Sequence, residues 1–235
     1  MADQEYTEQN SEYLKGNPTW HVEQSPWKAT QILKMMERNK LQPKTVVEIG
    51  CGAGEILNQL YQRMEDKTVQ FYGYEIAPDA FALSQSRTKD RLHFYHEDLL
   101  QNNKKFDLML MIDVFEHVDD YLGFLRKSKE KATYKIFHIP MDIAVLSIMN
   151  NNPMRQRNDV GHLHYYTKDT ALATLKDTGH EIVDWFYTKG GLELTDQKLN
   201  LKGRFTNFLR RVTYAMSPDF SVKMFGGFSL MVLAK

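Results

Sequence analysis

The chain has 235 residues, of which 42% are hydrophobic, and this is enough for one large domain with a sizeable core. Lysine and arginine together number 30, as do aspartate and glutamate, so no global positive field is available to hold nucleic acid. A single cysteine, Cys51, excludes an internal disulfide. With no secretory leader recognised and no apolar stretch near the roughly 20 residues that span a bilayer, we expect a cytoplasmic protein without a transmembrane segment.

Residues 1–30 are predicted to form an N-terminal cap or lid on a single domain of residues 1–235. Their first part is acidic, and the segment Trp20–Lys28 then combines aromatic and polar side chains. Ser25-Pro26 is a favourable helix start, because proline is tolerated in a first turn. We expect His21 and Trp27 to contact the substrate, with a helix cap anchored by tryptophan as the structural alternative.

From Thr45 onward, apolar runs of strand length alternate with helical patterns. This order predicts the α/β class, with a mainly parallel sheet and helices on both of its faces. A helix is expected after each of the first two strands, and another, capped by Thr167, is expected to end at Gly179. The predicted strands are Thr45–Ile49, Gln70–Tyr74, Leu92–Tyr95, Phe106–Ile112, Tyr134–Ile139, Glu181–Tyr187 and Phe228–Ala234.

Two later segments interrupt this alternation. Residues 141–166 are too long for a plain turn and are predicted to form an ordered substrate loop. Residues 190–227 are predicted to contain one amphipathic helix, with a basic insertion near 198–223 that belongs to the C-terminal part, residues 167–235. Packing on the sheet or contact with an acidic substrate is favoured for this basic helix over binding to a membrane surface.

The sharpest local signal is the sequence VVEIGCGAGE, in which a buried strand runs through glycines into a helix. Gly50, Gly52 and Gly54 remove the Cβ atoms that would block a ligand from the main chain, and Cys51 is a small filler between them. Glu75 follows Gly54 by 21 residues, at the end of the second strand, where a carboxylate can accept both hydroxyls of a ribose. Together these residues predict a nucleoside-binding site within residues 31–140.

The charges near the glycines distinguish between nucleoside cofactors. A dinucleotide-binding turn has a third glycine at position 55, but this chain has Glu55, which would repel a diphosphate at the helix start. Glu48 adds a second negative group just before the turn. Both acids favour a cationic nucleoside such as S-adenosylmethionine, and they disfavour the alternative of an NAD(P)-dependent oxidoreductase.

These residues resemble the class I S-adenosylmethionine-dependent methyltransferases, whose first motif reads acid-x-Gly-x-Gly-x-Gly. Glu75 in YGYEIAP, Asp98 in HEDLL and the run FDLMLMIDVFEHV continue the likeness over about residues 44–140. The resemblance implies a seven-stranded, doubly wound, Rossmann-like sheet with an antiparallel last strand, and S-adenosyl-L-methionine as cofactor. It implies cofactor contacts from Glu48, Gly50, Cys51, Gly52, Gly54, Glu75, Ile76, Asp98, Leu99 and Asp113.

Histidines are the natural bases to examine for methyl transfer, since their ordinary pKa lies near neutrality. His117 follows the fourth strand at the ligand-facing end of the sheet, and His162 and His164 alternate in an extended segment, so these three are the candidate catalytic residues. His138, Asp142 and Tyr165 are candidate substrate contacts. The alternative for each is a structural role.

No metal is expected, although one motif leaves the question open. Asp113, Glu116 and His117 form an acid-x-x-Glu-His pattern that is similar to one in ubiquinone-pathway O-methyltransferases, where it can hold a divalent cation.

The function expected is methyl transfer to a hydroxyl or amine of a small molecule. A sugar or sugar-linked metabolite is one candidate, because the GHLHYYT and IPMDIA regions are similar to methyltransferases of bacterial surface-polysaccharide clusters. The alternatives are a non-catalytic or membrane-peripheral binding module with the same fold and, less favoured, the oxidoreductase.

Overall fold

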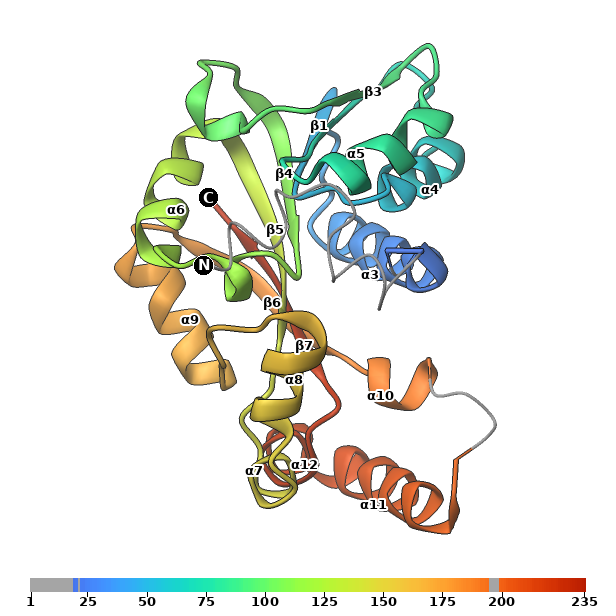
Figure 1. The fold of residues 1–235 in the computed structure, drawn as a ribbon, viewed down its shortest axis with the longest axis vertical. Helices are drawn as coiled ribbons and strands as arrows, with labels where there is room; N and C mark the ends of the chain where they lie inside the picture. The colour runs from blue at the N-terminus through green and yellow to red at the C-terminus, as the bar shows by residue number, and fades with distance from the viewer. Residues whose placement is uncertain (1–18, 21, 195–198) are drawn as a thin grey trace.

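The computed structural model describes residues 19–20, 22–194 and 199–235, and its centre is a seven-stranded sheet (Figure 1). The strand order is β3-β2-β1-β4-β5-β7-β6. Neighbouring strands are parallel from β3 through β5, whereas β7 runs antiparallel to both β5 and β6. This topology confirms the expected Rossmann-like fold with an antiparallel last strand.

The strands lie close to where the apolar runs predict them. Those of the first four runs begin and end at the predicted residues, and the last three differ by no more than two residues at either end. The strands are β1 (Thr45–Ile49), β2 (Gln70–Tyr74), β3 (Leu92–Tyr95), β4 (Phe106–Ile112), β5 (Ala132–Pro140), β6 (Ile182–Thr188) and β7 (Ser229–Ala234).

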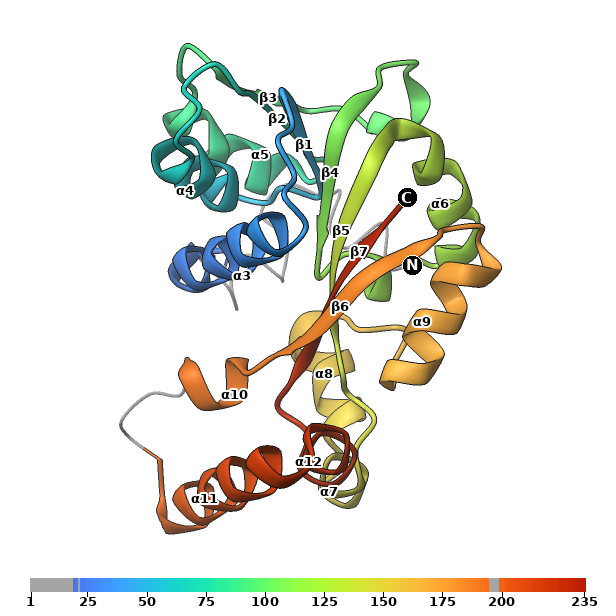
Figure 2. The same ribbon diagram turned by 180° about the vertical axis from the view of Figure 1, so that it is seen from behind.

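Helices cover both faces of the sheet, as Figure 2 shows from behind. One face packs against α3 (Ser25–Arg38) and α4 (Glu55–Arg63), whose buried side chains form one core cluster with the strands. The other face packs against α6 (Tyr121–Ser128) and α9 (Lys168–Asp177) in a second cluster. A further helix, α5 (Pro78–Ser84), follows β2.

Local chemistry explains where several helices begin. Pro26 stands in the first turn of α3, as predicted. Thr167 caps α9 with its side chain accepting from the Thr170 backbone N–H, and Gly179 takes a left-handed φ of 89° just after that helix. For α6 the cap is Asp120, because its carboxylate accepts from the Gly123 backbone N–H.

Residues 190–227 hold more than the single helix expected from the sequence. A short α10 (Gly190–Glu193) precedes α11 (Leu201–Met216), and α12 (Pro218–Phe225) follows directly. Ser217 and Pro218 separate the last two, because Ser217 caps α12 and proline has no N–H to continue α11.

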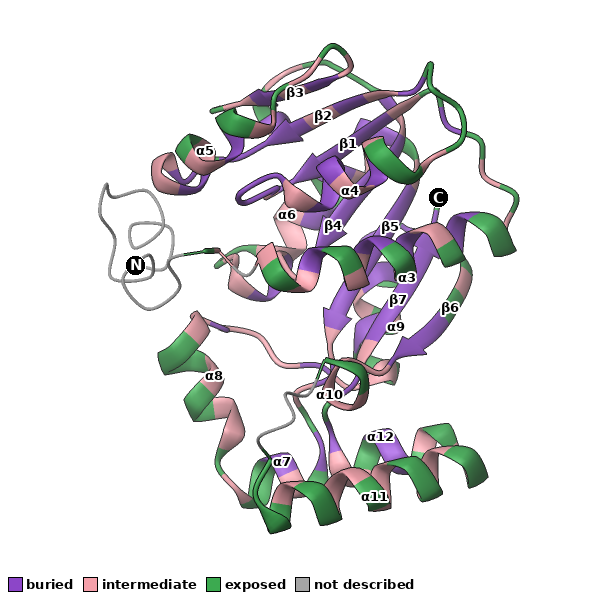
Figure 3. Cartoon of the chain, turned by 90° about the vertical axis from the view of Figure 1, so that its right-hand side faces the viewer, coloured by how far each residue is buried: buried purple, intermediate pink, exposed green. Residues whose placement is uncertain are grey.

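The segment 141–166 also contains helices, α7 (Val145–Met149) and α8 (Asn152–Val160). Together with α11 and α12 these helices gather at one end of the molecule, where Figure 3 shows much of their surface exposed. That end lies beyond the carboxyl ends of β4 and β5 (Figure 1). Among the described residues, no helix is long and apolar enough to cross a membrane.

Candidate functional site

The turn between β1 and α4 has a backbone that strongly favours glycine. Gly50, Gly52 and Gly54 have φ values of 65°, 54° and 77°. A Cβ at Gly54 would lie 2.4 Å from the Phe94 ring, and one at Gly52 would lie 2.7 Å from the Trp20 ring. The turn therefore combines left-handed backbone with close approach by neighbouring rings, as the sequence predicts for a ligand cradle.

Glu75 ties this turn to the end of β2. One of its carboxylate oxygens accepts from the Gly52 backbone N–H at 2.8 Å, and the other accepts from the Ala77 N–H at 2.8 Å. Burial raises the pKa of Glu75, although these backbone bonds oppose the rise. Each oxygen retains a further lone pair, so the carboxylate can hold the loop and still accept ribose hydroxyls.

A cavity of about 300 Å³ opens beside Glu75 at the carboxyl ends of β1, β2 and β4. Its walls are mainly apolar, with Leu99 buried below and Ile76 exposed at the rim. Asp98, whose Oδ1 accepts from the Leu100 N–H, also lines it. An apolar slot with acids at its edge fits an adenosine.

A second cavity of about 480 Å³ adjoins the first, and we name it the acceptor cavity. The residues that line both are Trp20, Gly50, Asp113 and His117. Glu48, Cys51 and Gly52 line the acceptor cavity from the glycine turn. A ligand that spans both cavities must therefore pass over the glycine turn, between Trp20 and the end of β4.

The acidic side chains at this junction are opposed by the cation Lys28 of α3. Its Nζ lies 2.8 Å from Asp113 Oδ2. Burial opposes ionisation of Asp113, but His138 and Lys28 outweigh it and hold the pKa of Asp113 well below its usual range. Glu48 is only 2% exposed, and its Oε2 has no hydrogen-bond partner among the described residues. That oxygen is therefore available to a bound ligand.

His138 fixes Asp113 from the side of β5. Its Nδ1 lies 2.6 Å from Asp113 Oδ1, and its Nε2 lies 2.9 Å from Thr188 Oγ1. Trp27 packs edge-on against the His138 ring, with ring centres 6.1 Å apart. Both ring nitrogens of His138 are thus engaged within the protein, although His138 and Trp27 line the acceptor cavity.

Two predicted catalytic histidines meet across the acceptor cavity. His117 and His162 have ring centres 4.9 Å apart, although 45 residues separate them in the chain. His162 Nδ1 lies 2.7 Å from Asp142 Oδ2, and His117 Nδ1 lies 3.2 Å from the carbonyl oxygen of Gly161. Burial, and then His162, lower the pKa of His117 to about 4, so its imidazole is neutral at pH 7.

Glu116 lies beneath this pair and is fully buried. Burial, and then the nearby Asp113, raise the pKa of Glu116 well above its usual range. Neither of its carboxylate oxygens has a hydrogen-bond partner within the described part of the chain.

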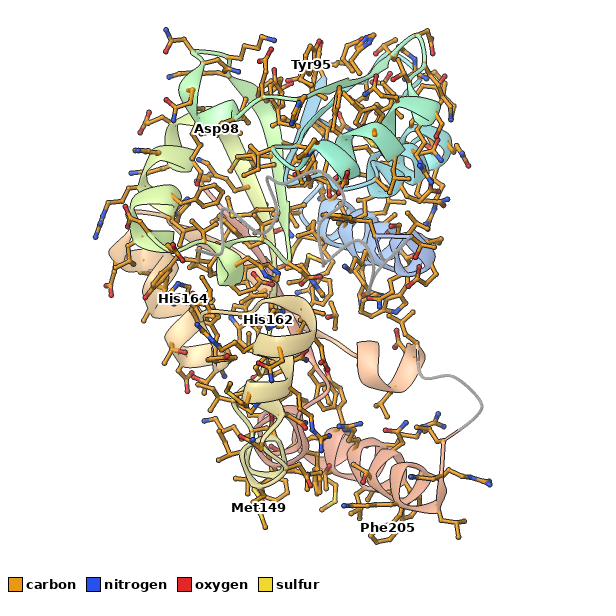
Figure 4. The ribbon with its side chains drawn as sticks, in the orientation of Figure 1. Tyr95, Asp98, Met149, His162, His164 and Phe205 are labelled. Atoms are coloured by element: carbon orange, nitrogen blue, oxygen red, sulfur yellow. The ribbon has the colours of Figure 1, made fainter. Side chains whose placement is uncertain are left out.

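Other residues expected at the site lie elsewhere. His164 and Tyr165 are not among the described residues that line either cavity: His164 Nε2 bonds to the carbonyl oxygen of Val118, and the Tyr165 hydroxyl donates to that of His162. His162 and His164, both labelled in Figure 4, therefore do not contact one substrate group together, as their alternation in the sequence suggests. Gly54 shapes the turn without lining a cavity, and His21 lies outside the described residues.

Sequence reasoning missed Lys28 and Gln156, both of which line the acceptor cavity. No local pattern distinguishes a lysine in the first turns of α3 from an exposed one. The burial of Lys28 and the buried acids opposite it can be seen only in the folded structure.

Glu55 is fixed in a way that bears on phosphate binding. It stands at the start of α4, and its carboxylate accepts from Arg87 and from the side-chain amides of Asn58 and Gln59. A carboxylate thus stands at the helix end where a diphosphate would bind. The glycine cradle, the unpartnered Glu48 oxygen and the apolar slot fit the expected cationic nucleoside instead.

Comparisons with known proteins bear on the family and the fold. A family model described as a methyltransferase domain matches residues 21–184. No curated protein matches the chain. Among solved structures, magnesium protoporphyrin IX methyltransferase from Synechocystis PCC 6803 with bound SAH is 15% identical, with a TM-score of 0.58 over 97% of this chain and 88% of that one.

Two other solved structures have the same fold. Cyclopropane synthase MmaA2 from Mycobacterium tuberculosis is 15% identical, with a TM-score of 0.60 over 87% of this chain and 84% of that one. Phosphoethanolamine N-methyltransferase 2 from Haemonchus contortus, in complex with S-adenosyl-L-methionine, is 13% identical, with a TM-score of 0.57 over 87% of this chain and 52% of that one.

Proposed function

The chain belongs to the class I S-adenosylmethionine-dependent methyltransferases, and we propose that it methylates a hydroxyl or amine of a small polar molecule. The observation that carries this proposal is the acceptor cavity, which adjoins the glycine turn and is lined by His117 and His162. When bound, S-adenosylmethionine supplies a methyl group on a positive sulfur that is open to in-line displacement.

The cofactor-binding roles follow from the two cavities. In this proposal Glu75 accepts the ribose hydroxyls, while Ile76, Asp98 and Leu99 surround the adenine. Gly50 and Gly52 let the ligand approach the main chain closely, and Glu48 binds the ammonium group of the ligand. Asp113 keeps its charge through Lys28 and His138 and adds to the negative field that attracts a sulfonium.

The walls of the acceptor cavity favour a hydrogen-bonding molecule. A volume of about 480 Å³ lies in the ordinary range for small-molecule sites, and Trp27 supplies an aromatic wall beside the polar Gln156. A sugar or sugar-linked metabolite suits this mixture of aromatic and polar groups. We propose it as the acceptor class, in a cytoplasmic enzyme that does not bind nucleic acid.

A hydroxyl acceptor must lose its proton during transfer, and His117 and His162 are the groups placed to promote that loss. Asp142 accepts from His162 Nδ1 and thereby leaves the lone pair of that imidazole on Nε2. Asp142 does not line the cavity itself, so we propose that it positions His162.

Calorimetric titration with S-adenosylhomocysteine tests the cofactor site. We expect saturable binding to the wild type, and at least tenfold weaker binding to Glu75→Gln, because an amide cannot accept at both oxygen positions. Glu65→Gln, an exposed acid just after α4, is the matched control and should bind as the wild type does. Absence of binding by folded wild-type protein would contradict the proposal.

Mass spectrometry of reactions with hydroxylated and amino acceptors tests the activity. Transfer of one methyl group to a sugar nucleotide or free sugar, lost in His162→Asn, is the expected result. Cofactor binding with no methylated product from any acceptor would favour a non-catalytic binding module instead.

A further inference from the structure

Three side chains at the acceptor cavity have the composition of a metal site. These are Glu116, His117 and His162, and each contributes one ligand atom that lies within 4.8 Å of the other two. They come from the turn after β4 and from the segment after α8, so the fold, and not the local sequence, brings them together. His117 and His162 also line the acceptor cavity, so an ion among the three would face that space.

Both histidines are oriented in the way that metal-binding histidines usually are. The carbonyl oxygen of Gly161 only accepts, so the bond to it places a proton on His117 Nδ1 and the lone pair on Nε2. The Asp142 carboxylate has the same effect on His162. Such outer bonds to a carbonyl or a carboxylate fix the tautomer and increase the basicity of the ligating nitrogen.

Glu116 supplies the second, independent observation. Its side chain is 0% exposed, and neither carboxylate oxygen has a hydrogen-bond partner among the described residues. Burying a carboxylate without a partner is costly, and a cation is one of the few partners that removes this cost.

We propose that Glu116, His117 and His162 bind a divalent transition metal, Zn²⁺ being the closest fit to two imidazoles and a carboxylate. One ligand atom from each of the three donors already lies within 4.8 Å of the other two. Asp113 is not a ligand, because Lys28 and His138 hold its carboxylate, and His162 replaces it in the acid-x-x-Glu-His pattern.

An ion held by these side chains would face the acceptor cavity, which His117 and His162 line. If the proposed methyl transfer is correct, the metal would lower the pKa of an acceptor hydroxyl, and His117 and His162 would then promote its proton loss by holding the metal. Metal binding itself does not depend on that function.

Cobalt provides the direct test, because Co²⁺ bound by nitrogen and oxygen ligands absorbs visible light. We expect chelator-treated full-length protein to bind one Co²⁺ per chain with a visible spectrum, and Zn²⁺ to displace it. Glu116→Gln and His162→Asn should each weaken binding by at least tenfold, whereas the control His164→Asn should bind as the wild type does. Circular dichroism verifies that each variant is folded.

The inference is overturned if the folded wild type binds neither ion, or if both site variants bind Co²⁺ as tightly as the wild type. Because the titration contains no cofactor and no acceptor, a failure of methyl transfer leaves its result unaffected. Co²⁺ binding without methyl transfer would contradict the proposed function alone.

A separate feature lies on α11, which buries no residue completely. Five large apolar side chains recur every three or four residues along one side of the helix and are 42–83% exposed. They are Leu201, Phe205, Phe208, Val212 and Met216. Another side of α11 packs inward. There the Tyr214 ring stacks on the Phe228 ring with ring centres 5.3 Å apart, and Arg210 donates to the Phe225 carbonyl oxygen.

Neighbouring helices extend this apolar face. Ile148 and Met149 of α7 are 56% and 78% exposed, and Phe220 of α12 is 51% exposed. Figure 4 shows Met149 and Phe205 at the same end of the molecule, and Figures 1 and 2 place α7, α11 and α12 together there. We call this surface the α7–α11 face.

The charged side chains of α11 all have one sign. Helix α11 contains Lys202, Arg204, Arg210 and Arg211 and no acidic residue. A second copy of the same face would be repelled by these cations, whereas an anionic lipid surface is complementary to them and receives the apolar side chains. We infer that the α7–α11 face docks on anionic membranes, contrary to the sequence-based preference for packing or substrate contact.

Co-sedimentation with vesicles tests this docking. The wild type should bind vesicles that contain one quarter phosphatidylglycerol and not vesicles of phosphatidylcholine alone. Phe205→Ser/Phe208→Ser and Lys202→Glu/Arg211→Glu should each reduce the bound fraction at least fivefold, while the exposed control Lys67→Glu should not. Arg210 is left unchanged because it bonds to α12.

Failure of the wild type to bind either vesicle would overturn the docking proposal. So would a concentration-dependent dimer in sedimentation equilibrium that disappears in Phe205→Ser/Phe208→Ser, because a second copy would then cover the face.

Discussion

The glycine turn after β1 combines two independent requirements for the absence of a side chain. Gly54 has a φ of 77°, which strains any other residue, and its missing Cβ makes room for the Phe94 ring. Spacing within the sequence revealed the first requirement. The second depends on a ring from β3, 40 residues later, and could not be read locally.

We expect Gly54→Ala to cost about 2–4 kcal/mol of unfolding free energy, from backbone strain together with overpacking against Phe94. Chemical denaturation measures this cost. Gly203→Ala, which lies in the exposed helix α11 at an ordinary φ, is the control and should change stability by less than about 1 kcal/mol. Equal effects of the two substitutions would contradict the assignment of strain to the turn.

Buried histidines away from the cavities make stability depend on pH. Burial, and then Lys135, lower the pKa of His180 to about 4, whereas an unfolded histidine titrates near 6.5. As pH falls below about 6.5, the unfolded chain takes up a proton that the folded chain excludes. The folded state therefore loses stability down to about pH 4.

His180→Gln should remove this dependence. Between pH 7 and pH 4.5 the stability of the wild type relative to this variant should fall by about 2–3 kcal/mol, at 1.36 kcal/mol per pKa unit. Denaturant titrations at both pH values give the difference. A constant difference would show that His180 is protonated alike in the folded and unfolded chains.

At the scale of elements, prediction succeeded for the buried strands and was less complete for the segments outside the sheet. The inner strands are continuous apolar runs because helices cover both faces of the sheet, so their ends could be read directly. Helices α7 and α8 together bury only Ser147, and therefore have no apolar periodicity to indicate them. For α11 and α12, a single amphipathic pattern concealed the break at Ser217.

The Thr167 cap offers a test at this scale. Thr167→Ala removes the acceptor for the Thr170 N–H and one half of the capping box, and should cost about 1 kcal/mol. Thr174→Ala, in the same helix but away from its end, should change the unfolding free energy by no more than about 0.5 kcal/mol. Thermal unfolding compares the two, and equal losses would exclude a capping effect.

For the whole molecule, the candidate site shows both the reach and the limit of sequence reasoning. Glu75, Asp98 and the glycines could be predicted because each follows a strand whose carboxyl end must face the same edge of the sheet. The encounter of His162 with His117 depends on the path of α7 and α8, which no spacing encodes. Lys28 reaches Asp113 only because α3 packs against one face of the sheet.

Ligand binding should stabilise the entire fold. At 100 times its dissociation constant, S-adenosylhomocysteine should add about 2.7 kcal/mol and raise the melting temperature by about 5–10 °C. NADH at the same concentration should leave it unchanged, because Glu55 stands where its diphosphate would bind. A rise in melting temperature with NADH and none with S-adenosylhomocysteine would favour the oxidoreductase.

A crystal structure with bound S-adenosylhomocysteine tests the central claim most directly. The ligand should lie with its ribose hydroxyls on Glu75, its adenine beside Leu99 and its sulfur facing the acceptor cavity. A ligand bound away from the glycine turn, or with its adenine outside the slot beside Leu99, would contradict the account.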